Sequence, residues 1–306
     1  MSANPTLEGR VVAVTGAGRG IGREIAILAA SQGAAVVVND YGGSVDGEGS
    51  DRGPAQEVVD AIKSAGGRAV ANTDSVADPK GAERIVATAL DNFGKIDGLV
   101  NNAGILRDKI FHHMTEEDFN LVVDVHLRGS FYVARAAAPH FRKQGFGSMV
   151  HMTSTSALVG NIAQANYSAA KLGIAGLSRS IAIDMQKFGV RSNAIAPFAW
   201  SRLVGTMPEE AMQRNFDLAK MQAVSPAHIA PVVTFLLSDA ASEINGQIFG
   251  VRKNEIFLMS QPRPIRQIHK SDGWGLGDLA NVMLPAFKSS LVPLESSGDV
   301  FSWDAI

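Results

Sequence analysis

The chain contains no cysteine among its 306 residues. Disulfides, thiolate catalysis and cysteine-ligated zinc or iron–sulfur centres are therefore excluded, and a reducing cytoplasmic location is expected. No apolar run approaches the roughly 18 residues that a membrane helix needs, and the first residues lack the basic and apolar regions of a secretory signal. The formal net charge of −2 attracts neither nucleic acid nor an anionic membrane. We therefore expect a soluble cytoplasmic protein that acts on a small molecule.

The segment Val11–Gly33 carries the strongest motif in the chain. A short apolar run predicts a buried strand, a glycine-rich loop follows, and an apolar-periodic helix is expected over residues 23–31. Glycine lacks a Cβ atom, so the loop can turn tightly and approach a bound group, and the N-terminus of the following helix suits a pyrophosphate. A plain tight turn is the alternative interpretation. The loop residues predicted to contact a dinucleotide are Gly16, Gly18, Arg19, Gly20, Ile21 and Gly22.

An acidic residue, Asp40, follows the second predicted strand, residues 34–38. It lies roughly 20 residues after the glycine loop, where a carboxylate accepts hydrogen bonds from the adenosine ribose hydroxyls. The same negative charge repels the 2′-phosphate of NADP, so NAD is the expected cofactor. Arg19 is the one loop residue that favours NADP instead. An ordinary turn residue at a strand end is the alternative for Asp40.

Predicted strands and helices alternate along the chain, and its 46% apolar and 19% charged residues are typical of a globular protein. Because the strands are continuously apolar, helices are expected on both faces of a parallel sheet. We expect an α/β fold, a single-domain Rossmann-type doubly wound parallel sheet over residues 7–251, with a lid at about 199–224 and an arm-like C-terminal extension at 252–306. The other predicted helices span residues 54–65, 79–93, 115–141, 163–187 and 226–237, and the other predicted strands span residues 68–72, 96–100, 148–152, 190–196 and 247–251.

Tyr167 and Lys171 form the candidate catalytic pair. They are four residues apart on the predicted helix 163–187, which places both on one helix face. A free tyrosine has a pKa of about 10. A nearby lysine ammonium and a positive nicotinamide ring would lower that pKa and make the phenol an acid/base near neutral pH. Taken alone, the same spacing also occurs on ordinary helix faces.

Three further motifs, together with this pair, resemble the short-chain dehydrogenase/reductase family. They are Thr-Gly-x-x-x-Gly-x-Gly at residues 15–22, Asn-Asn-Ala-Gly at residues 101–104, and Ser154, thirteen residues before Tyr167. The resemblance implies that Ser154 hydrogen-bonds the substrate oxygen, that Tyr167 is the acid/base and that Lys171 also holds the nicotinamide ribose. The neighbouring hydroxyl residues that are alternatives for the serine role are Thr153, Thr155 and Ser156.

The resemblance also implies cofactor contacts outside the glycine loop. Ser75 and Val76 would flank the adenine at the end of the third strand. Asn102 would tie adjacent strand ends together beside the cofactor, because its amide both donates and accepts hydrogen bonds. Pro197 would lie along the nicotinamide; the family often has glycine after this proline, whereas Phe198 follows it here, so a different local backbone is expected.

Four stretches narrow the resemblance to the (3R)-hydroxyacyl-CoA dehydrogenase part of multifunctional enzyme type 2. His126 belongs to one of them, at a position where many family members have an asparagine that links the lysine to a chain of waters. This subgroup has histidine there. The imidazole can carry a proton or hold a water, and a buried core histidine is the alternative. The stretches are VVVNDYGG (36–43), NAGILRD (102–108), HLRGSF (126–131) and QANYSAAKL (164–172).

The extension after residue 251 is similar to the tails of actinobacterial steroid-degradation relatives. Basic residues outnumber acidic ones at its start. It could pack on a neighbouring subunit, hold the phosphates of a large acyl carrier, or lie on its own subunit. The resemblance further implies a homodimer or homotetramer formed through the helices near residues 115–143 and 163–187.

These expectations combine into one principal hypothesis and several alternatives. The principal one is an NAD-dependent oxidoreductase that interconverts a secondary alcohol and a ketone on a 3-hydroxyacyl-CoA, including one with a steroid-derived acyl group. A hydroxysteroid dehydrogenase and a 3-oxoacyl-carrier-protein reductase are the alternatives among enzymes. A non-catalytic dinucleotide-binding scaffold is a remote alternative. No metal site is expected.

Overall fold

The computed structural model describes residues 6–44, 46, 48–49, 53–199 and 224–306. Its strands, in chain order, are β1 (Val11–Thr15), β2 (Ala35–Asn39), β3 (Arg68–Asn72), β4 (Gly98–Asn101), β5 (Gly147–Met152), β6 (Val190–Phe198), β7 (Ile248–Arg252) and β8 (Glu255–Leu258). They form one sheet in the order β3-β2-β1-β4-β5-β6-β7-β8. Pairing is parallel from β3 to β7, and β8 is antiparallel to β7. The predicted parallel sheet is thus confirmed, and β8 is an addition at one edge.

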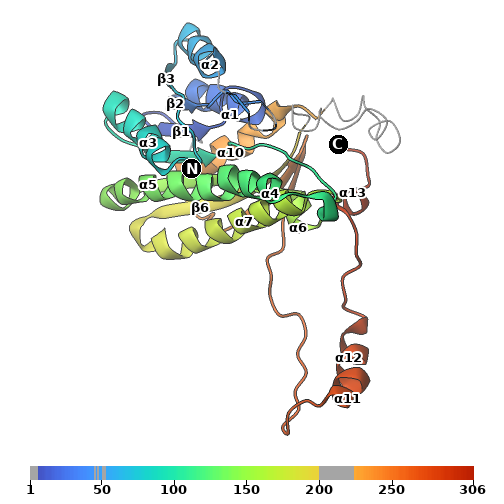
Figure 1. Cartoon of the computed structure of the whole chain (residues 1–306). Helices are drawn as coiled ribbons and strands as arrows, with labels where there is room; N and C mark the ends of the chain where they lie inside the picture. Colours follow the sequence, from blue (N-terminus) through green and yellow to red (C-terminus); the bar gives the residue numbers. More distant parts are fainter. Residues whose placement is uncertain (1–5, 45, 47, 50–52, 200–223) are drawn as a thin grey trace.

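Helices cover both faces of this sheet. They are α1 (Gly20–Ser31), α2 (Gly53–Ser64), α3 (Pro79–Phe93), α4 (Glu116–Val123), α5 (Gly129–Gln144), α6 (Thr155–Leu158), α7 (Ala165–Met185), α10 (Ala230–Leu237), α11 (Leu276–Asp278), α12 (Leu284–Lys288) and α13 (Ser297–Val300). Helices α1, α2 and α10 pack on one face, and α3, α5 and α7 pack on the other (Figure 1).

Alternate residues of the central strands enter two separate cores. Val12 and Val14 pack with α1 on one face, while Val11 and Ala13 pack with α3 on the other. Side chains alternate between the faces of a strand, so a strand covered on both sides needs apolar residues at every position. This burial explains why the strands read as continuous apolar runs in the sequence.

β1 is the strand at which the direction of winding reverses. It pairs with β2 on one side and with β4 on the other. In such sheets the loops at the carboxyl ends of the strands separate at this point and leave a crevice where ligands bind. The glycine loop, the end of β2 and the Asn101–Gly104 segment therefore converge at one edge.

The predicted helix 115–141 is interrupted in the structure. Thr115 begins it with a reciprocal capping interaction with Asp118, and α4 then ends at a π-helical turn, Asp124–Arg128, before α5 continues. A π turn inserts one extra residue and redirects the side chains within it. His126 lies in this turn and is 1% exposed. Sequence periodicity did not reveal the change of helix type.

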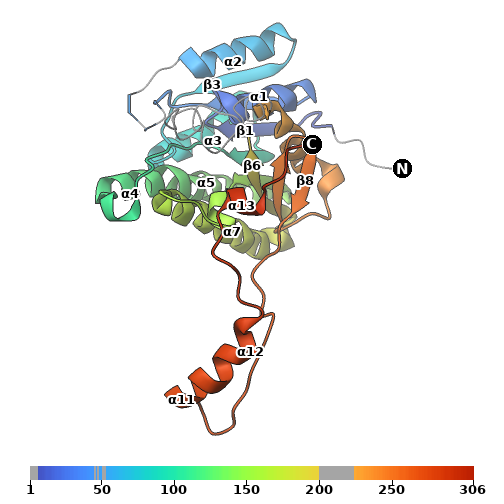
Figure 2. The ribbon, with the colours of Figure 1, turned by 90° about the vertical axis from the view of Figure 1, so that its right-hand side faces the viewer.

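The C-terminal extension contributes both to the sheet and to a projecting arm. Residues between β8 and α13 leave the body, carry α11 and α12 at the far end, and return so that α13 and the C-terminus lie against the body (Figures 1 and 2). Apolar side chains exposed on the arm include Ile265, Leu276, Leu284, Val292 and Leu294. Among the described helices, none is long and apolar enough to cross a membrane. The predicted lid lies outside the described residues, apart from Ala199 and Val224 at its ends.

Candidate active site

The glycine loop is held against the Asn-Asn-Ala-Gly segment. Gly16 has φ +62°, and a Cβ atom there would lie 2.7 Å from Ala103 Cα. A Cβ atom on Gly22 would lie 2.3 Å from the Gly16 carbonyl oxygen. Asn102 donates to the carbonyl oxygens of Thr15 and Gly16, each at 3.0 Å, so it joins the ends of β1 and β4 as predicted. A residue with a Cβ atom therefore cannot replace Gly16 or Gly22 unless the backbone moves.

Asp40 faces the glycine loop from the end of β2. Its carboxylate accepts hydrogen bonds from the backbone N–H groups of Gly18 and Gly42, both at 2.7 Å. A Cβ atom on Gly18 would lie 2.8 Å from the Asp40 carboxylate oxygen. The absence of a side chain at Gly18 therefore allows the carboxylate to approach the loop.

A cleft opens at this edge of the sheet, and it contains most of the predicted cofactor residues. Five of the predicted cofactor residues do not line it: Gly18, Gly22, Tyr167, Lys171 and Pro197. Gly18 and Gly22 instead allow the loop to pack against Asp40 and Asn102. The predicted residues that line the cleft are Gly16, Arg19, Gly20, Ile21, Asp40, Ser75, Val76 and Asn102. Lining residues that the sequence analysis did not select include Tyr41, Asp74, Ile105, Leu121 and Val125.

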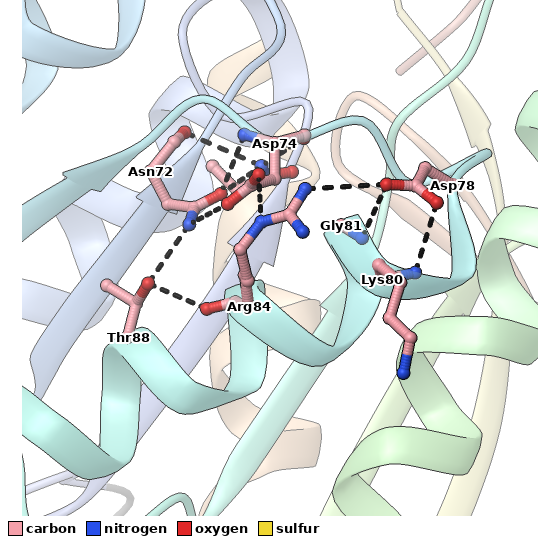
Figure 3. A network of polar contacts seen from close by, with 8 residues as sticks. Asn72, Asp74, Asp78, Lys80, Gly81, Arg84 and Thr88 are labelled. Carbon is pink, nitrogen blue, oxygen red and sulfur yellow. Dashed lines mark hydrogen bonds and ion pairs between the residues drawn. The ribbon is translucent and has the colours of Figure 1, made fainter.

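Asp74 is held rigidly in the wall of the cleft. Its carboxylate accepts hydrogen bonds from Arg84 Nε at 2.7 Å and from Asn72 Nδ2 at 2.9 Å (Figure 3). Arg84 also reaches Asp78, which caps the N-terminus of α3. The network fixes the carboxylate beside Ser75. Its position two residues after β3 was the available sequence signal, because polar residues at carboxyl ends of parallel strands meet in the crevice.

Helix α7 and the end of β5 bring the predicted catalytic residues together. The Ser154 side chain interacts with the buried Tyr167 phenol and lowers its pKa. Lys171 is 4% exposed, its Nζ donates to the Met152 carbonyl oxygen at 2.7 Å, and Nζ lies 5.6 Å from the centroid of the Tyr167 ring. Thr153 donates to the Lys171 carbonyl oxygen and therefore turns away from the tyrosine. These contacts favour Ser154 for the substrate-facing hydroxyl.

The expected lowering of the phenol pKa is not produced by the protein groups. Burial raises the pKa of Tyr167 to about 12; the Ser154 hydroxyl opposes the rise and Asp108 adds to it. Burial also lowers the pKa of Lys171 to about 7. A lysine that is only partly protonated near neutral pH supplies less charge to stabilise a phenolate, so the sequence-based expectation overestimated its effect. A cationic ring beside the phenol would supply the missing charge.

The buried lysine predicts a pH dependence of stability. The pKa of Lys171 is about 7 in the folded protein, against an ordinary value of 10.5. Between those values the unfolded chain binds more protons, so the free energy of unfolding should rise with pH by up to about 1.4 kcal/mol per unit. Lys171→Met should remove this slope, whereas the exposed Lys187→Met should retain it. Urea denaturation between pH 7 and 10.5 measures the slope for the wild type and for each variant. Equal slopes in the three proteins would contradict the prediction.

His126 lies directly against the catalytic tyrosine. Its ring packs edge-on against Tyr167 with centroids 5.2 Å apart, and its Nε2 is 2.8 Å from the Ile105 carbonyl oxygen. Nδ1 is buried and has no hydrogen-bond partner among the described residues. Burial and the charge of Lys171 lower the pKa of His126 well below 6.5, so the imidazole is neutral. A Cβ atom on Gly104 would lie 2.3 Å from this ring.

A glycine loop, an acidic residue after β2 and a serine–tyrosine–lysine set define an oxidoreductase that uses a nicotinamide dinucleotide. The chain belongs to the short-chain dehydrogenase/reductase family, because residues 16–252 match the protein family described as enoyl-(acyl carrier protein) reductase and relatives in that family are up to 46% identical. The predicted family, enzyme class and fold are thereby confirmed.

The most similar proteins include bacterial and animal enzymes. A short-chain type dehydrogenase/reductase of Mycobacterium tuberculosis is 46% identical over 248 residues, which are 81% of this chain and 83% of the relative. Peroxisomal multifunctional enzyme type 2 of Mus musculus is 46% identical over 252 residues, 82% of this chain but 32% of that enzyme. The chain thus spans about a third of this multifunctional relative. The hydroxyacyl-CoA dehydrogenase ChsB1 of M. tuberculosis is 37% identical, over 87% of this chain and 84% of its own length.

Two solved structures resemble the whole fold. A short chain dehydrogenase from Mycobacterium avium has a TM-score of 0.83 and 38% identity, covering 96% of this chain and 99% of its own. A 7α-hydroxysteroid dehydrogenase, complexed with NADH and 7-oxo glycochenodeoxycholic acid, has a TM-score of 0.74 and 33% identity. The match covers 83% of this chain and 97% of that enzyme. The first similarity extends over nearly all of this chain, including its C-terminal extension.

Proposed function

We propose that this protein is an NAD-dependent dehydrogenase of 3-hydroxyacyl-CoA thioesters. The observation that carries the proposal is the interaction of Ser154 with the buried phenol of Tyr167, which lies one helical turn from the buried Lys171. The names of two relatives, multifunctional enzyme type 2 and the hydroxyacyl-CoA dehydrogenase ChsB1, support an acyl-CoA substrate. The proposal includes thioesters with a steroid-derived acyl group.

The roles of the catalytic residues follow from their contacts. When bound, the nicotinamide ring supplies the hydride acceptor for the carbinol carbon. Tyr167 Oη takes the hydroxyl proton as the carbonyl forms, and Ser154 Oγ orients the substrate oxygen by hydrogen bonding. Lys171 Nζ holds the end of β5 through the Met152 carbonyl and keeps a donor next to the site. Neutral His126 packs against the phenol and restricts its orientation.

The proposed cofactor contacts divide between the two ends of the cleft. Gly16, Arg19, Gly20 and Ile21 would contact the pyrophosphate, with Gly18 and Gly22 shaping that loop from behind. Asp40 would bind the adenosine ribose, and Ser75 and Val76 would flank the adenine. Asn102, Lys171 and Pro197 would lie beside the nicotinamide riboside. The residues fit a dinucleotide because the loop admits no Cβ atom at its closest approaches.

Asp40→Ala is expected to shift cofactor preference toward NADP. Removing the carboxylate removes the ribose acceptor and the repulsion of the 2′-phosphate. The ratio of kcat/KM for NAD to that for NADP should fall roughly tenfold or more, about 1.4 kcal/mol of discrimination. Initial rates with both cofactors measure it. Asp60→Ala, on the exposed face of α2, is the matched control; an unchanged ratio in Asp40→Ala would remove this residue from cofactor selection.

The proposed activity is tested with a panel of substrates. Purified protein and NAD should form NADH with 3-hydroxyacyl-CoA thioesters of several chain lengths and with a thioester of a steroid side chain. The absorbance of NADH measures the rate. Free hydroxysteroids test the alternative suggested by the 7α-hydroxysteroid dehydrogenase. A 3-oxoacyl-carrier-protein with NADPH tests the reductase alternative. Turnover of none of these secondary alcohols or ketones would favour the non-catalytic scaffold.

We also propose that the protein is a cytoplasmic homodimer or homotetramer. Large apolar side chains are exposed on the two helices that the family resemblance assigns to subunit contacts. They are Phe131 on α5 and Leu172 and Ile183 on α7, with exposed fractions of 46%, 52% and 60%. Burial of such side chains between subunits would be favourable. Light scattering should give a mass of two or four chains.

A further inference from the structure

The returning C-terminal segment lies against the loop that carries the catalytic serine. Helix α13 lies beside α6 at the right-hand side of the body in Figure 1. Ser297 is only 8% exposed, its backbone N–H donates to the Gly160 carbonyl oxygen at 2.8 Å, and its Oγ donates to Asn161 Oδ1 at 2.8 Å. Residues far apart in the sequence are thus joined by two hydrogen bonds.

These contacts continue inward to the catalytic serine. Asn161 Nδ2 donates to Ser156 Oγ at 2.9 Å. The Ser156 backbone N–H donates to Ser154 Oγ at 3.1 Å, which caps α6. Ser154 in turn interacts with the Tyr167 phenol and lowers its pKa. A connected series of hydrogen bonds therefore runs from the C-terminal segment to Ser154.

The same segment is anchored independently on the other side of the site. The Phe301 ring packs edge-on against the ring of Phe198, the residue that follows Pro197 in the chain, with centroids 4.9 Å apart. The buried guanidinium of Arg252 donates to the Phe301 and Trp303 carbonyl oxygens at 3.2 and 2.9 Å. The Glu255 carboxylate completes the anchor by accepting from Arg252 Nε and Trp303 Nε1, each at 2.7 Å.

We propose that residues 297–303 are a positioning element of the active site, acting on Ser154 through the Ser297–Asn161 hydrogen bond. The proposal rests on the function proposed above for Ser154. The end of the α6–α7 loop nearest α7 is held by Lys109, whose N–H donates to the Ala163 carbonyl oxygen at 2.9 Å. At the end nearest α6, Gly160 adopts φ +142° and Asn161 is exposed, and the contacts from Ser297 hold both residues. Fixing this loop from outside reduces the freedom of the Ser154 hydroxyl, since a misplaced orienting group lowers the chemical rate without weakening dinucleotide binding.

The test compares two substitutions of one serine. Ser297→Ala removes the bond to Asn161, whereas Ser297→Thr keeps the hydroxyl. We expect Ser297→Ala to lower kcat roughly fivefold, as for loss of one ordinary hydrogen bond, with NADH affinity unchanged. Ser297→Thr should retain most of the wild-type kcat. A wild-type kcat in Ser297→Ala would overturn the proposal.

A second measurement does not depend on catalysis. Amide hydrogen exchange of residues 155–161 should accelerate in Ser297→Ala but not in Ser297→Thr, because the loop opens more often without its outer support. If the wild-type protein oxidises no substrate, the proposed function fails and this exchange comparison alone decides the positioning role. If Ser297→Ala does not fold, Phe301→Ala, which loosens the segment at its other anchor, replaces it in both measurements. Unchanged exchange in the folded variant would overturn the positioning role.

Discussion

Tyr167→Phe is expected to lower kcat roughly a hundred- to ten-thousandfold, the range for losing a positioned acid/base. The substitution removes only the hydroxyl that Ser154 contacts, and it keeps the ring that packs against His126. NADH affinity should remain close to that of the wild type, because the cleft that fits a dinucleotide is lined by other residues. Steady-state rates and fluorescence titration with NADH measure the two quantities.

Tyr132→Phe is the matched control for this experiment. Tyr132 lies on α5 and packs beside Phe131, away from the cleft, so loss of its hydroxyl should leave kcat unchanged. A Tyr167→Phe protein with the wild-type kcat would refute the acid/base role. A variant that loses NADH affinity as strongly as turnover would show instead that the phenol mainly supports cofactor binding.

Gly22→Ala is expected to weaken dinucleotide binding tenfold or more, about 1.4 kcal/mol or above. The added methyl group would lie 2.3 Å from the Gly16 carbonyl oxygen and 2.5 Å from Asn102 Nδ2. These neighbours are backbone and a side chain held by two hydrogen bonds, so the loop itself must move. Such overpacking typically also lowers stability by about 1 to 3 kcal/mol. NADH titration and thermal unfolding measure both effects.

Gly176→Ala provides the contrast within a helix. Gly176 lies inside α7 with nothing within 4 Å of an added Cβ atom. Alanine has the higher helix propensity by roughly 1 kcal/mol, so this variant should be as stable as the wild type or more stable, with unchanged NADH affinity. If Gly22→Ala behaves like Gly176→Ala, the glycine is not required for the packing of the loop.

The sequence was sufficient to predict those features of the structure that depend on residues close together in the chain. The parallel strands were located to within two residues at each end, because burial on both faces requires continuous apolar runs. Tyr167 and Lys171 share a helix, so their proximity followed from a four-residue spacing. Asn102 was expected to join strand ends, and its hydrogen bonds to Thr15 and Gly16 do so.

Other features depend on contacts between distant parts of the chain. The pKa of Lys171 is lowered by burial, which the local sequence does not specify, and this weakens the expected effect on Tyr167. Asp74 lies two residues after β3, whereas Asp40 directly follows β2, and the sequence analysis did not select Asp74; its place in the cleft and its bond to Arg84 come from the structure. The π turn around His126 likewise could not be predicted from the hydrophobic periodicity.

The sequence by itself determined the alternating α/β fold, the glycine loop and the proximity of Tyr167 to Lys171, because each is encoded by residues close together in the chain. The tertiary structure alone decided the ionisation of Lys171, the choice of Ser154 over Thr153, and the return of Ser297 to the catalytic loop. The physical reason is that desolvation and long-range hydrogen bonds arise only when segments separated by many residues are packed together.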